Sequence, residues 1–436
     1  MNDTELFPVL KAGSREADGR LQKIKNRNLT FDEKLISKVS EIIRTVRVEG
    51  DPALKRFTKE FDGITLNQIR VPIEEIEKAR AILSDDILSI LREAVARVRK
   101  FHEMQKQTSW HVQEEDGTLL GQRIIPVDKV ALYVPGGTAT YPSTVIMNAV
   151  PAQVARVRDI ILLTPPNKDG NVNQIVLATC SILGIENVFS IGGAQAIAAA
   201  AYGTGSVPKV DKIVGPGNIY VSAAKKLVYG DVDIDMIAGP SEVVVLADGS
   251  ADPAEVAADL LAQSEHDANA AGILVTTDSG FARKVQRRIL KYLQSLPRSQ
   301  IASESMRRNG TAFVVGDLHS GVDLVNQIAP EHLEIIAEGD LELAGKIVNA
   351  GAIFVGRYSP EPVGDYFAGP SHVLPTGGTA RFSSVLNVDS FVKRSSIIRY
   401  SRDAFERDSA KIRVLAEHEG LDAHALSIKV REKSGR

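Results

Sequence analysis

The sequence predicts an α/β protein with two Rossmann-like parallel-sheet domains and small helical arms at its N- and C-terminal ends. Short apolar runs alternate with helical segments, first over residues 130–230 and again over 241–358. Such alternation of strands and helices is typical of parallel sheets. Glycine-rich turns follow several expected strands, but none has the G-x-G-x-x-G spacing of the common dinucleotide fingerprint. We therefore expect two such domains without that motif.

The first alternation predicts four buried strands with helices between and after them. The runs are short and continuously apolar, as strands covered on both faces are. The expected strands are 130–134, 159–164, 187–193 and 211–215, and the expected helices are 143–157, 173–185, 194–203 and 219–230.

The second alternation predicts strands at 241–248, 270–277, 311–316 and 351–358. A helix is expected after the first of them, because Asp252 is a good N-cap and Pro253 suits the first helical position. Amphipathic spacing predicts two further helices, at 31–50 and 85–105. After residue 381 the chain becomes charged and helical in pattern.

These patterns suggest four divisions of the chain. Residues 1–30 are expected to be an N-terminal arm, and 131–236 an α/β domain. A second, discontinuous α/β domain is expected from residues 31–130 and 237–380. Residues 381–436 have a thin apolar stripe for an independent domain, so they are expected to dock on something larger.

Composition excludes several classes of function. A length of 436 residues with 44% apolar residues is enough for more than one domain with a core. The formal charge of -3 provides no basic surface for nucleic acid. No apolar run is long enough to span a membrane, and the first residues do not resemble a secretory signal. A single cysteine, Cys180, fits a reducing compartment, so we expect a cytoplasmic protein.

Gln263 and His266 end the expected helix in "DPAEVAADLLAQSEHD". Val256 and Leu260 mark its apolar stripe, and Gln263 continues that stripe two turns after Val256. At a spacing of i, i+3, an amide and an imidazole can reach one metal ion from one helix face. The alternative is an ordinary polar helix end.

Asp365 and His424 are two further candidate ligands. Asp365 lies in a loop rich in glycine and proline after an expected strand, a common place for functional carboxylates. An Asx turn would use the same residue. His424 begins the last expected helix behind Asp422 and could equally be a surface histidine. Spacing alone does not join these segments into one site.

Glu331 and His332 form an adjacent acid and base in "NQIAPEHLEI". Such a pair can supply two separate acid/base groups to a cleft. The alternative is a solvated helix start, where a glutamate is favourable at the positive end of the helix dipole.

Three glycine-rich turns, in "YVPGGTATYPST", "SIGGAQAI" and "IVGPGNIYVS", stand at the carboxyl ends of expected strands. Ligands of open α/β sheets bind there, and backbone N–H groups at a helix start can hold an anion. Each turn alone could be structural. Together they favour a nucleotide or phosphate site, without establishing nicotinamide dinucleotide.

Several long segments resemble the histidinol dehydrogenase family. They are "YVPGGTATYPSTVIMNAVPA", "GGAQAIAA", "VGPGNIYV", "DMIAGPSEVVVLAD", "LLAQSEHD", "IAPEHLEI", "GDYFAGPSHVLPTGGTARFSS" and "EGLDAHA". They occur in the family's order over most of the chain. This family carries out the last two oxidations of histidine biosynthesis.

The resemblance implies that the domain of residues 131–236 contacts NAD and that the discontinuous domain carries the zinc and catalytic residues. It also implies the roles of individual residues. It implies one Zn²⁺ per subunit, with the ligands Gln263, His266, Asp365 and His424. It implies the acid/base pair Glu331 and His332, and NAD contacts from Tyr133, Gln195 and Asn218. The implied substrate-binding residues are Ser241, Gln263, His266, His332, Asp365, His372, Glu419 and His424.

The resemblance also implies an activity and an assembly. L-histidinol would be oxidised to L-histidine through bound L-histidinaldehyde, with two NAD. The C-terminal arm would cross a homodimer, so that Glu419 and His424 complete the partner's site. The alternatives are a related dehydrogenase for another small alcohol such as a sulfonated diol, a zinc hydrolase, and a non-catalytic binding protein.

Cys180 could suggest a thiohemiacetal mechanism, as in aldehyde dehydrogenases. It lies in an expected helix among apolar neighbours, with no histidine or basic residue nearby in sequence. We therefore expect a packed core thiol without a catalytic role.

Overall fold

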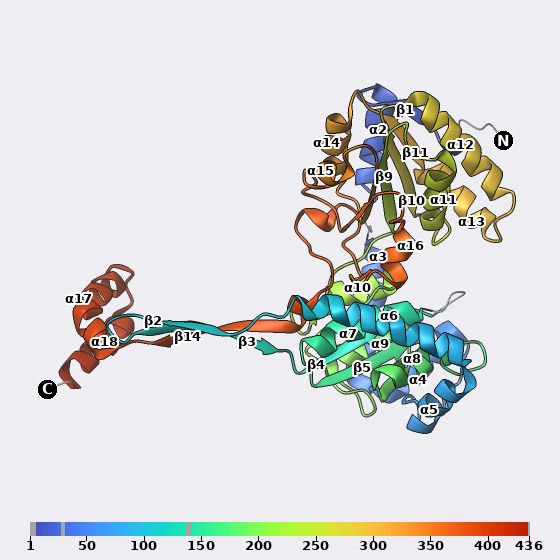
Figure 1. Cartoon of the computed structure of the whole chain (residues 1–436). Helices are drawn as coiled ribbons and strands as arrows, with labels where there is room; N and C mark the ends of the chain where they lie inside the picture. Colours follow the sequence, from blue (N-terminus) through green and yellow to red (C-terminus); the bar gives the residue numbers. More distant parts are fainter. Residues whose placement is uncertain (1–5, 28–30, 137–140, 435–436) are drawn as a thin grey trace. The chain divides into compact units, whose positions relative to one another are not determined.

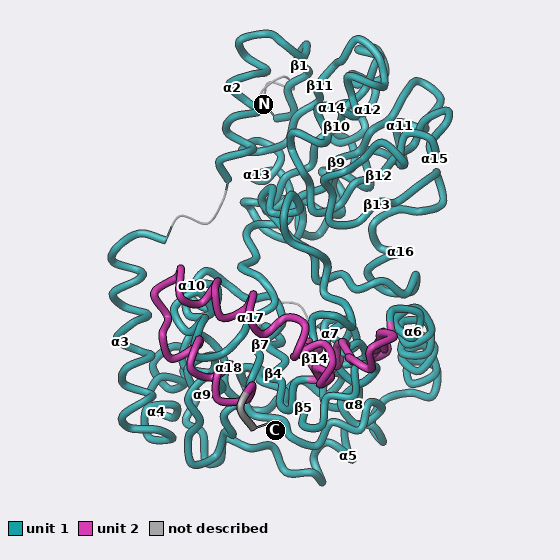
Figure 2. The backbone as a smooth tube through the Cα atoms, turned by 90° about the vertical axis from the view of Figure 1, so that its left-hand side faces the viewer, with its two compact units in different colours: residues 1–105, 127–391 teal, residues 106–126, 392–436 magenta. Residues whose placement is uncertain are grey.

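The computed structural model describes residues 6–27, 31–136 and 141–434. The chain divides into two compact units (Figure 2). The first consists of residues 1–105 and 127–391, and the second of residues 106–126 and 392–436.

The first unit contains a five-stranded parallel sheet in the order β6-β5-β4-β7-β8. Its strands are β4 (Lys129–Tyr133), β5 (Asp159–Thr164), β6 (Asn187–Ser190), β7 (Lys212–Val214) and β8 (Asp233–Ile234). The helices that alternate with them are α7 (Pro142–Val154), α8 (Gln174–Leu183), α9 (Gly193–Tyr202) and α10 (Ile219–Val228). The four expected strands and four expected helices are therefore confirmed, and β8 is an addition.

Four N-terminal helices pack against this sheet and its helices. They are α3 (Glu33–Glu49), α4 (Asp51–Asp62), α5 (Ile73–Ile82) and α6 (Asp85–Glu103). Val39 and Leu54 share one buried core with strand residues such as Ala131 and Ile161. The expected division placed residues 31–130 with the other sheet. The apolar stripes of these helices instead bury against the five-stranded one.

A six-stranded parallel sheet forms the other half of this unit, in the order β1-β11-β10-β9-β12-β13. Its strands are β1 (Val9–Lys11), β9 (Glu242–Ala247), β10 (Ala271–Thr276), β11 (Thr311–Val314), β12 (His332–Ile336) and β13 (Ala352–Val355). In Figure 1 its helices cover both faces. α11 (Pro253–Ser264), α12 (Ser279–Leu293) and α13 (Ser299–Asn309) pack in one core, while α2 (Arg15–Lys25), α14 (Leu318–Ile328) and α15 (Asp340–Ala344) pack in the other.

The N-terminal segment differs from the expected arm. β1 pairs in parallel with β11, with Val9 opposite Ala312. Ala17 and Ile24 of α2 are buried on the sheet. One short edge strand and one narrow apolar stripe are enough to attach the segment to the sheet. The polar composition of residues 1–30 therefore gave no sign of this packing.

β12 is a central strand that the pattern analysis did not expect. It lies between β9 and β13. Leu333 and Ile335 point into one core and alternate with His332 and Glu334, which point to the opposite face. The strand therefore carries two ionisable side chains on a buried face, which masks its apolar character in the sequence.

The second unit is a three-stranded antiparallel sheet followed by a helix pair. The sheet has the order β14-β3-β2, with β2 (Trp110–Gln113), β3 (Leu119–Pro126) and β14 (Val392–Arg399). The helices are α17 (Arg402–His418) and α18 (Asp422–Ser434), with Gly420 between them at a φ of 72°. The segment after residue 381 was expected to be wholly helical, and this expectation is wrong for β14. Polar and apolar residues of β14 do not alternate, so the strand has no apolar face that would mark it in the sequence.

Among the described residues, no helix combines the length and the apolar character that crossing a bilayer requires.

Candidate active site

The candidate catalytic residues lie at the amino-terminal edge of the six-stranded sheet. His332 is the first residue of β12, and Glu331 precedes it. Ser241 directly precedes β9, the neighbouring strand. α11 follows β9 and runs back toward this edge, so Gln263 in its last turn reaches the same region. Parallel strands that begin side by side thus bring distant segments together.

His332 is buried, and its two ring nitrogens have different surroundings. Nδ1 lies 3.2 Å from the backbone oxygen of Glu242, to which it can donate a hydrogen. Nε2 is buried without a hydrogen-bond partner among the described residues. Burial is the main cause that lowers the pKa of His332 to about 3. The imidazole is therefore neutral at neutral pH, with Nε2 free to accept a proton.

Glu331 is buried, with 5% of the residue exposed. Its Oε2 accepts a hydrogen bond of 3.0 Å from the backbone N–H of Glu242. Burial and then the nearby Glu242 carboxylate raise its pKa well above the usual value, while the Glu242 N–H and the Ser241 hydroxyl lower it. A carboxylate with a raised pKa is a stronger base than a solvated one. The expected alternative, a solvated helix start, is wrong, because both residues are buried where a strand begins.

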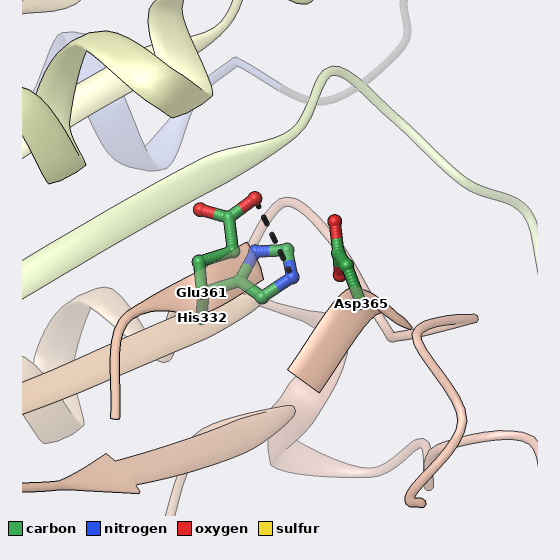
Figure 3. Close-up of side chains that lie close together, drawn as sticks. All are labelled: His332, Glu361 and Asp365. Carbon is green, nitrogen blue, oxygen red and sulfur yellow. Dashed lines mark ion pairs between the residues drawn. The ribbon is translucent and has the colours of Figure 1, made fainter. Parts of the chain in front are cut away.

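Gln263, Glu361 and Asp365 gather around His332. α16 (Glu361–Tyr366) places Glu361 and Asp365 one turn apart on one face. Ligand atoms of His332, Glu361 and Asp365 lie within 4.8 Å of one another (Figure 3). The ion-pair distance from His332 Nε2 to Glu361 Oε1 is 4.0 Å. When the amide of Gln263 is oriented so that its nitrogen faces Glu361, this nitrogen donates hydrogen bonds of 2.8 and 2.7 Å to the two carboxylate oxygens.

Glu361 was missed by sequence reasoning. It stands between two prolines, four residues before Asp365. That i, i+4 spacing was the available signal, because it puts both carboxylates on one face of any helix that starts there.

His372 and His266 complete the group in this unit. His372 Nδ1 lies 3.8 Å from Asp365 Oδ1, and its Nε2 lies 3.5 Å from Thr144 Oγ1. Burial lowers the pKa of His372 to about 4. His266 follows α11 and lies near enough for its charge to lower the pKa values of both His332 and His372.

The donors present fit a divalent metal ion. Gln263, His266 and Asp365 offer an amide, an imidazole and a carboxylate, a mixed N/O set that suits zinc. Burial raises the pKa of Asp365 to about 6. Burial and neighbouring carboxylates also raise the pKa of Glu361 well above its usual value. A divalent cation would favour the ionised form of both groups.

Two of the predicted substrate and metal residues, Glu419 and His424, belong to the second unit. Glu419 caps the end of α17, and His424 lies in the first turn of α18. The residues that the structure brings together in the first unit therefore do not include them.

The three predicted dinucleotide contacts line one cavity of about 970 Å³ at the carboxyl edge of the five-stranded sheet. Tyr133 ends β4, Gln195 lies in α9, and Asn218 caps α10. The Tyr133 hydroxyl accepts a hydrogen bond of 3.1 Å from the N–H of Gly193 at the start of α9. Gln195 Oε1 is buried without a partner among the described residues. The volume of this cavity is at the upper end of the range for cofactor pockets. A bound dinucleotide would offer a hydrogen-bond donor to this oxygen.

Cys180 is fully buried in α8, and burial raises the pKa of its thiol to about 12. It is a packed core residue, as expected.

The chain matches known proteins over nearly its whole length. Residues 25–432 match the family model described as histidinol dehydrogenase. A histidinol dehydrogenase of Halalkalibacterium halodurans is 55% identical over 91% of this chain and 94% of that protein. The enzyme of that name from Bacillus subtilis is 52% identical over 91% of this chain and 92% of its own.

A solved structure shows the same fold. The crystal structure of histidinol dehydrogenase from Elizabethkingia anophelis superposes with a TM-score of 0.90 at 38% identity. The match covers 95% of this chain and 96% of that one.

Proposed function

Because the chain belongs to the histidinol dehydrogenase family, we propose that it oxidises L-histidinol to L-histidine through bound L-histidinaldehyde, with two NAD as hydride acceptors. The observation that carries the proposal is the buried Glu331–His332 pair beside Gln263 and Asp365. One base can serve both oxidations there, and a second group can activate water for the aldehyde.

His332 moves the proton in each oxidation. Its Nδ1–H is held by the Glu242 carbonyl, which leaves Nε2 to accept the hydroxyl proton of the alcohol. The same nitrogen then accepts the proton of the aldehyde hydrate. The NAD molecules supply the chemistry of hydride acceptance, and Tyr133, Gln195 and Asn218 would hold them in the cavity that these residues line.

Glu331 acts only on the aldehyde. Its Oε2 is fixed by the Glu242 N–H at 3.0 Å. In its ionised form this carboxylate is a stronger base for water than a solvated one, because burial raises its pKa. The alcohol needs no water to lose its hydride, so the first oxidation does not need Glu331 as a base.

Gln263, His266 and Asp365 would hold one zinc ion with His424. The ion would orient the imidazole and amino nitrogens of histidinol and fix the substrate against His332. Ser241 and His372 would contact the substrate from the same edge of the sheet, and Glu419 would pair with its ammonium group.

The second unit supports a shared site in a homodimer. Its described residues expose many large apolar side chains, among them Trp110, Val112, Ile398, Leu415 and Leu426, each at least half exposed. A small unit with so many exposed apolar side chains is expected to cover them with a partner. We propose that this partner is a second copy, whose site receives Glu419 and His424. A cytoplasmic location is part of the same proposal.

The test is an absorbance assay for NADH with purified protein, L-histidinol and NAD. NADH should form, a chelator should stop it, and added zinc should restore it. A related dehydrogenase for another alcohol would prefer a sulfonated diol in the same assay. A zinc hydrolase or a binding protein would form no NADH with either substrate.

A further inference from the structure

Arg27 reaches the catalytic edge of the six-stranded sheet from the N-terminal segment. It follows α2, and its side chain is 8% exposed. Its Nη2 shares its hydrogens among three consecutive residues, at 3.1 Å from Pro240 O, 3.3 Å from Ser241 O and 3.1 Å from Glu242 Oε2. One guanidinium group therefore holds the turn that leads into β9.

Glu242 links this anchor to both proposed acid/base residues. Its backbone N–H donates to Glu331 Oε2, and its backbone oxygen faces His332 Nδ1. Its own carboxylate pairs with Arg27 and accepts a hydrogen bond of 3.0 Å from Gly377 N–H. The side chain is 2% exposed. The orientation of the catalytic pair thus depends on where this one residue is held.

The two acid/base residues depend on the turn to different degrees. His332 is in β12, and the ladder that pairs it with Val243 of β9 already fixes its backbone. Glu331 lies before the strand, so its carboxyl group takes its direction from Ser241 and Glu242 in the turn. Displacement of the turn should move Glu331 more than His332.

Stability alone does not explain a buried arginine here. Its Nε and Nη1 are buried without partners among the described residues, which makes the ion pair imperfect. Buried pairs of this kind are often no more stabilising than apolar residues of similar size. The charge does have a local effect, because Glu242 and Glu331 are two buried carboxyl groups that repel each other, and Arg27 faces both.

We propose that Arg27 is a positioning residue for the second oxidation, acting through Ser241 and Glu242 on the carboxylate of Glu331. The inference rests on the proposed function. It also gives the N-terminal segment a role in the site, although it supplies no group that touches the substrate.

The test compares Arg27→Met and Arg27→Lys with a matched control, Arg20→Met. Arg20 is on α2 and donates to Gly310 O at 2.7 Å, and its Nε is likewise unpaired among the described residues. Its contacts are with the segment before β11 and not with the turn before β9. Unfolding temperature is measured for each variant, together with the single-turnover rate of the first hydride transfer from histidinol and with kcat and KM for histidinaldehyde.

Arg27→Met should lower kcat for the aldehyde roughly ten- to a hundredfold, since displacement of a catalytic group by about 1 Å can cost that much. The KM for NAD and the rate with the alcohol should change much less. Arg27→Lys keeps the charge and should recover part of the loss. If Arg27→Met does not fold, Arg27→Lys must still show a selective loss of the aldehyde step at a nearly unchanged unfolding temperature. Arg20→Met should keep the ratio of the two rates.

A double mutant separates positioning from general destabilisation. In a Glu331→Gln background, Arg27→Met should have little further effect on the aldehyde step, because the group it positions is already lost. Additive losses would overturn the inference, as would equal damage to both oxidations. If the wild-type protein does not oxidise histidinol at all, the proposed function itself is wrong. If the wild-type protein is active and the variants behave otherwise than expected, only the inference about Arg27 is wrong.

Discussion

Glu331 and His332 are neighbours in the sequence, yet their surroundings shift their pKa values in opposite directions. Burial raises the pKa of the carboxyl group and lowers that of the imidazole to about 3. Both shifts favour the neutral form of the group. A pair of groups driven apart in this way is typical of residues with separate acid/base roles.

Glu331→Gln should separate the two oxidations. The amide keeps the shape of the side chain but cannot accept a proton from water, so aldehyde oxidation should fall by roughly 10²- to 10⁴-fold. Oxidation of histidinol to the aldehyde should fall much less. Rapid-mixing measurements that start from each substrate give both rates. Equal losses in the two steps would count against a water-activating role for Glu331.

At the residue scale, sequence reasoning was best where a pattern breaks. Gln263 was noticed because an apolar stripe ends in an amide, and the structure places that amide against Glu361. Glu361 could have been found from its spacing to Asp365. Arg27 could not, because its partners are more than two hundred positions away and nothing local marks it.

Among the secondary-structure elements, β12 shows why short strands with charged residues are hard to recognise. Its core-facing residues alternate with His332 and Glu334, so the run is neither continuously apolar nor clearly half-exposed. The Glu334 carboxylate accepts a hydrogen bond of 2.7 Å from the N–H of Glu361. It thereby fixes the start of α16, the helix that carries Asp365.

This strand predicts a dependence of stability on pH. Burial and the nearby Asp259 raise the pKa of Glu334 to about 8. Between the ordinary glutamate pKa and about 8, the unfolded chain loses this proton while the folded chain keeps it, so stability falls as pH rises. Glu334→Gln removes the ionisation. It should raise the unfolding temperature by about 2–4 °C more at pH 8.5 than at pH 5.

Scanning calorimetry at the two pH values checks this expectation. Glu338→Gln is the matched control, because Glu338 follows the same strand but is exposed. An equal effect of Glu334→Gln at both pH values would show that the carboxyl group ionises normally in the folded protein.

The position of His266 at the end of α11 predicts that this residue can be replaced with loss of metal binding but without loss of the fold. His266 follows the helix and is exposed in the chain, while the apolar stripe of the helix is buried upstream. His266→Ala should therefore lose zinc and activity but keep its secondary structure. Metal analysis and circular dichroism test this, with His319→Ala as an exposed-histidine control. Global unfolding of the variant would mean that the metal is structural.

At the scale of the whole molecule, the second unit predicts a site shared between subunits. His332→Gln and His424→Ala chains should each be inactive alone. After subunit exchange, one site of every mixed dimer would have both residues intact, and activity should return to roughly a quarter of wild type, since random exchange makes about half of the dimers mixed. A mixture that exchanges but stays inactive would place His424 in the site of its own chain.

The sequence predicted most of the two-sheet architecture, because buried parallel strands read as apolar runs. It did not predict which helices cover which sheet. Residues 31–105 pack on the five-stranded sheet, and α2 packs on the six-stranded one. Both packings depend on contacts between residues far apart in the sequence, which local patterns do not specify. It also missed the antiparallel sheet of the second unit, since β14 has no apolar face of its own.

The central claim is that one site carries out both oxidations, and the ratio of NADH to histidine formed tests it most directly. Conversion of an alcohol to an acid removes four electrons, and each NAD accepts two. With limiting histidinol and excess NAD, the account predicts about two NADH for each histidine, with no free aldehyde trapped by an added carbonyl reagent. One NADH per histidinol with accumulation of the aldehyde would contradict it.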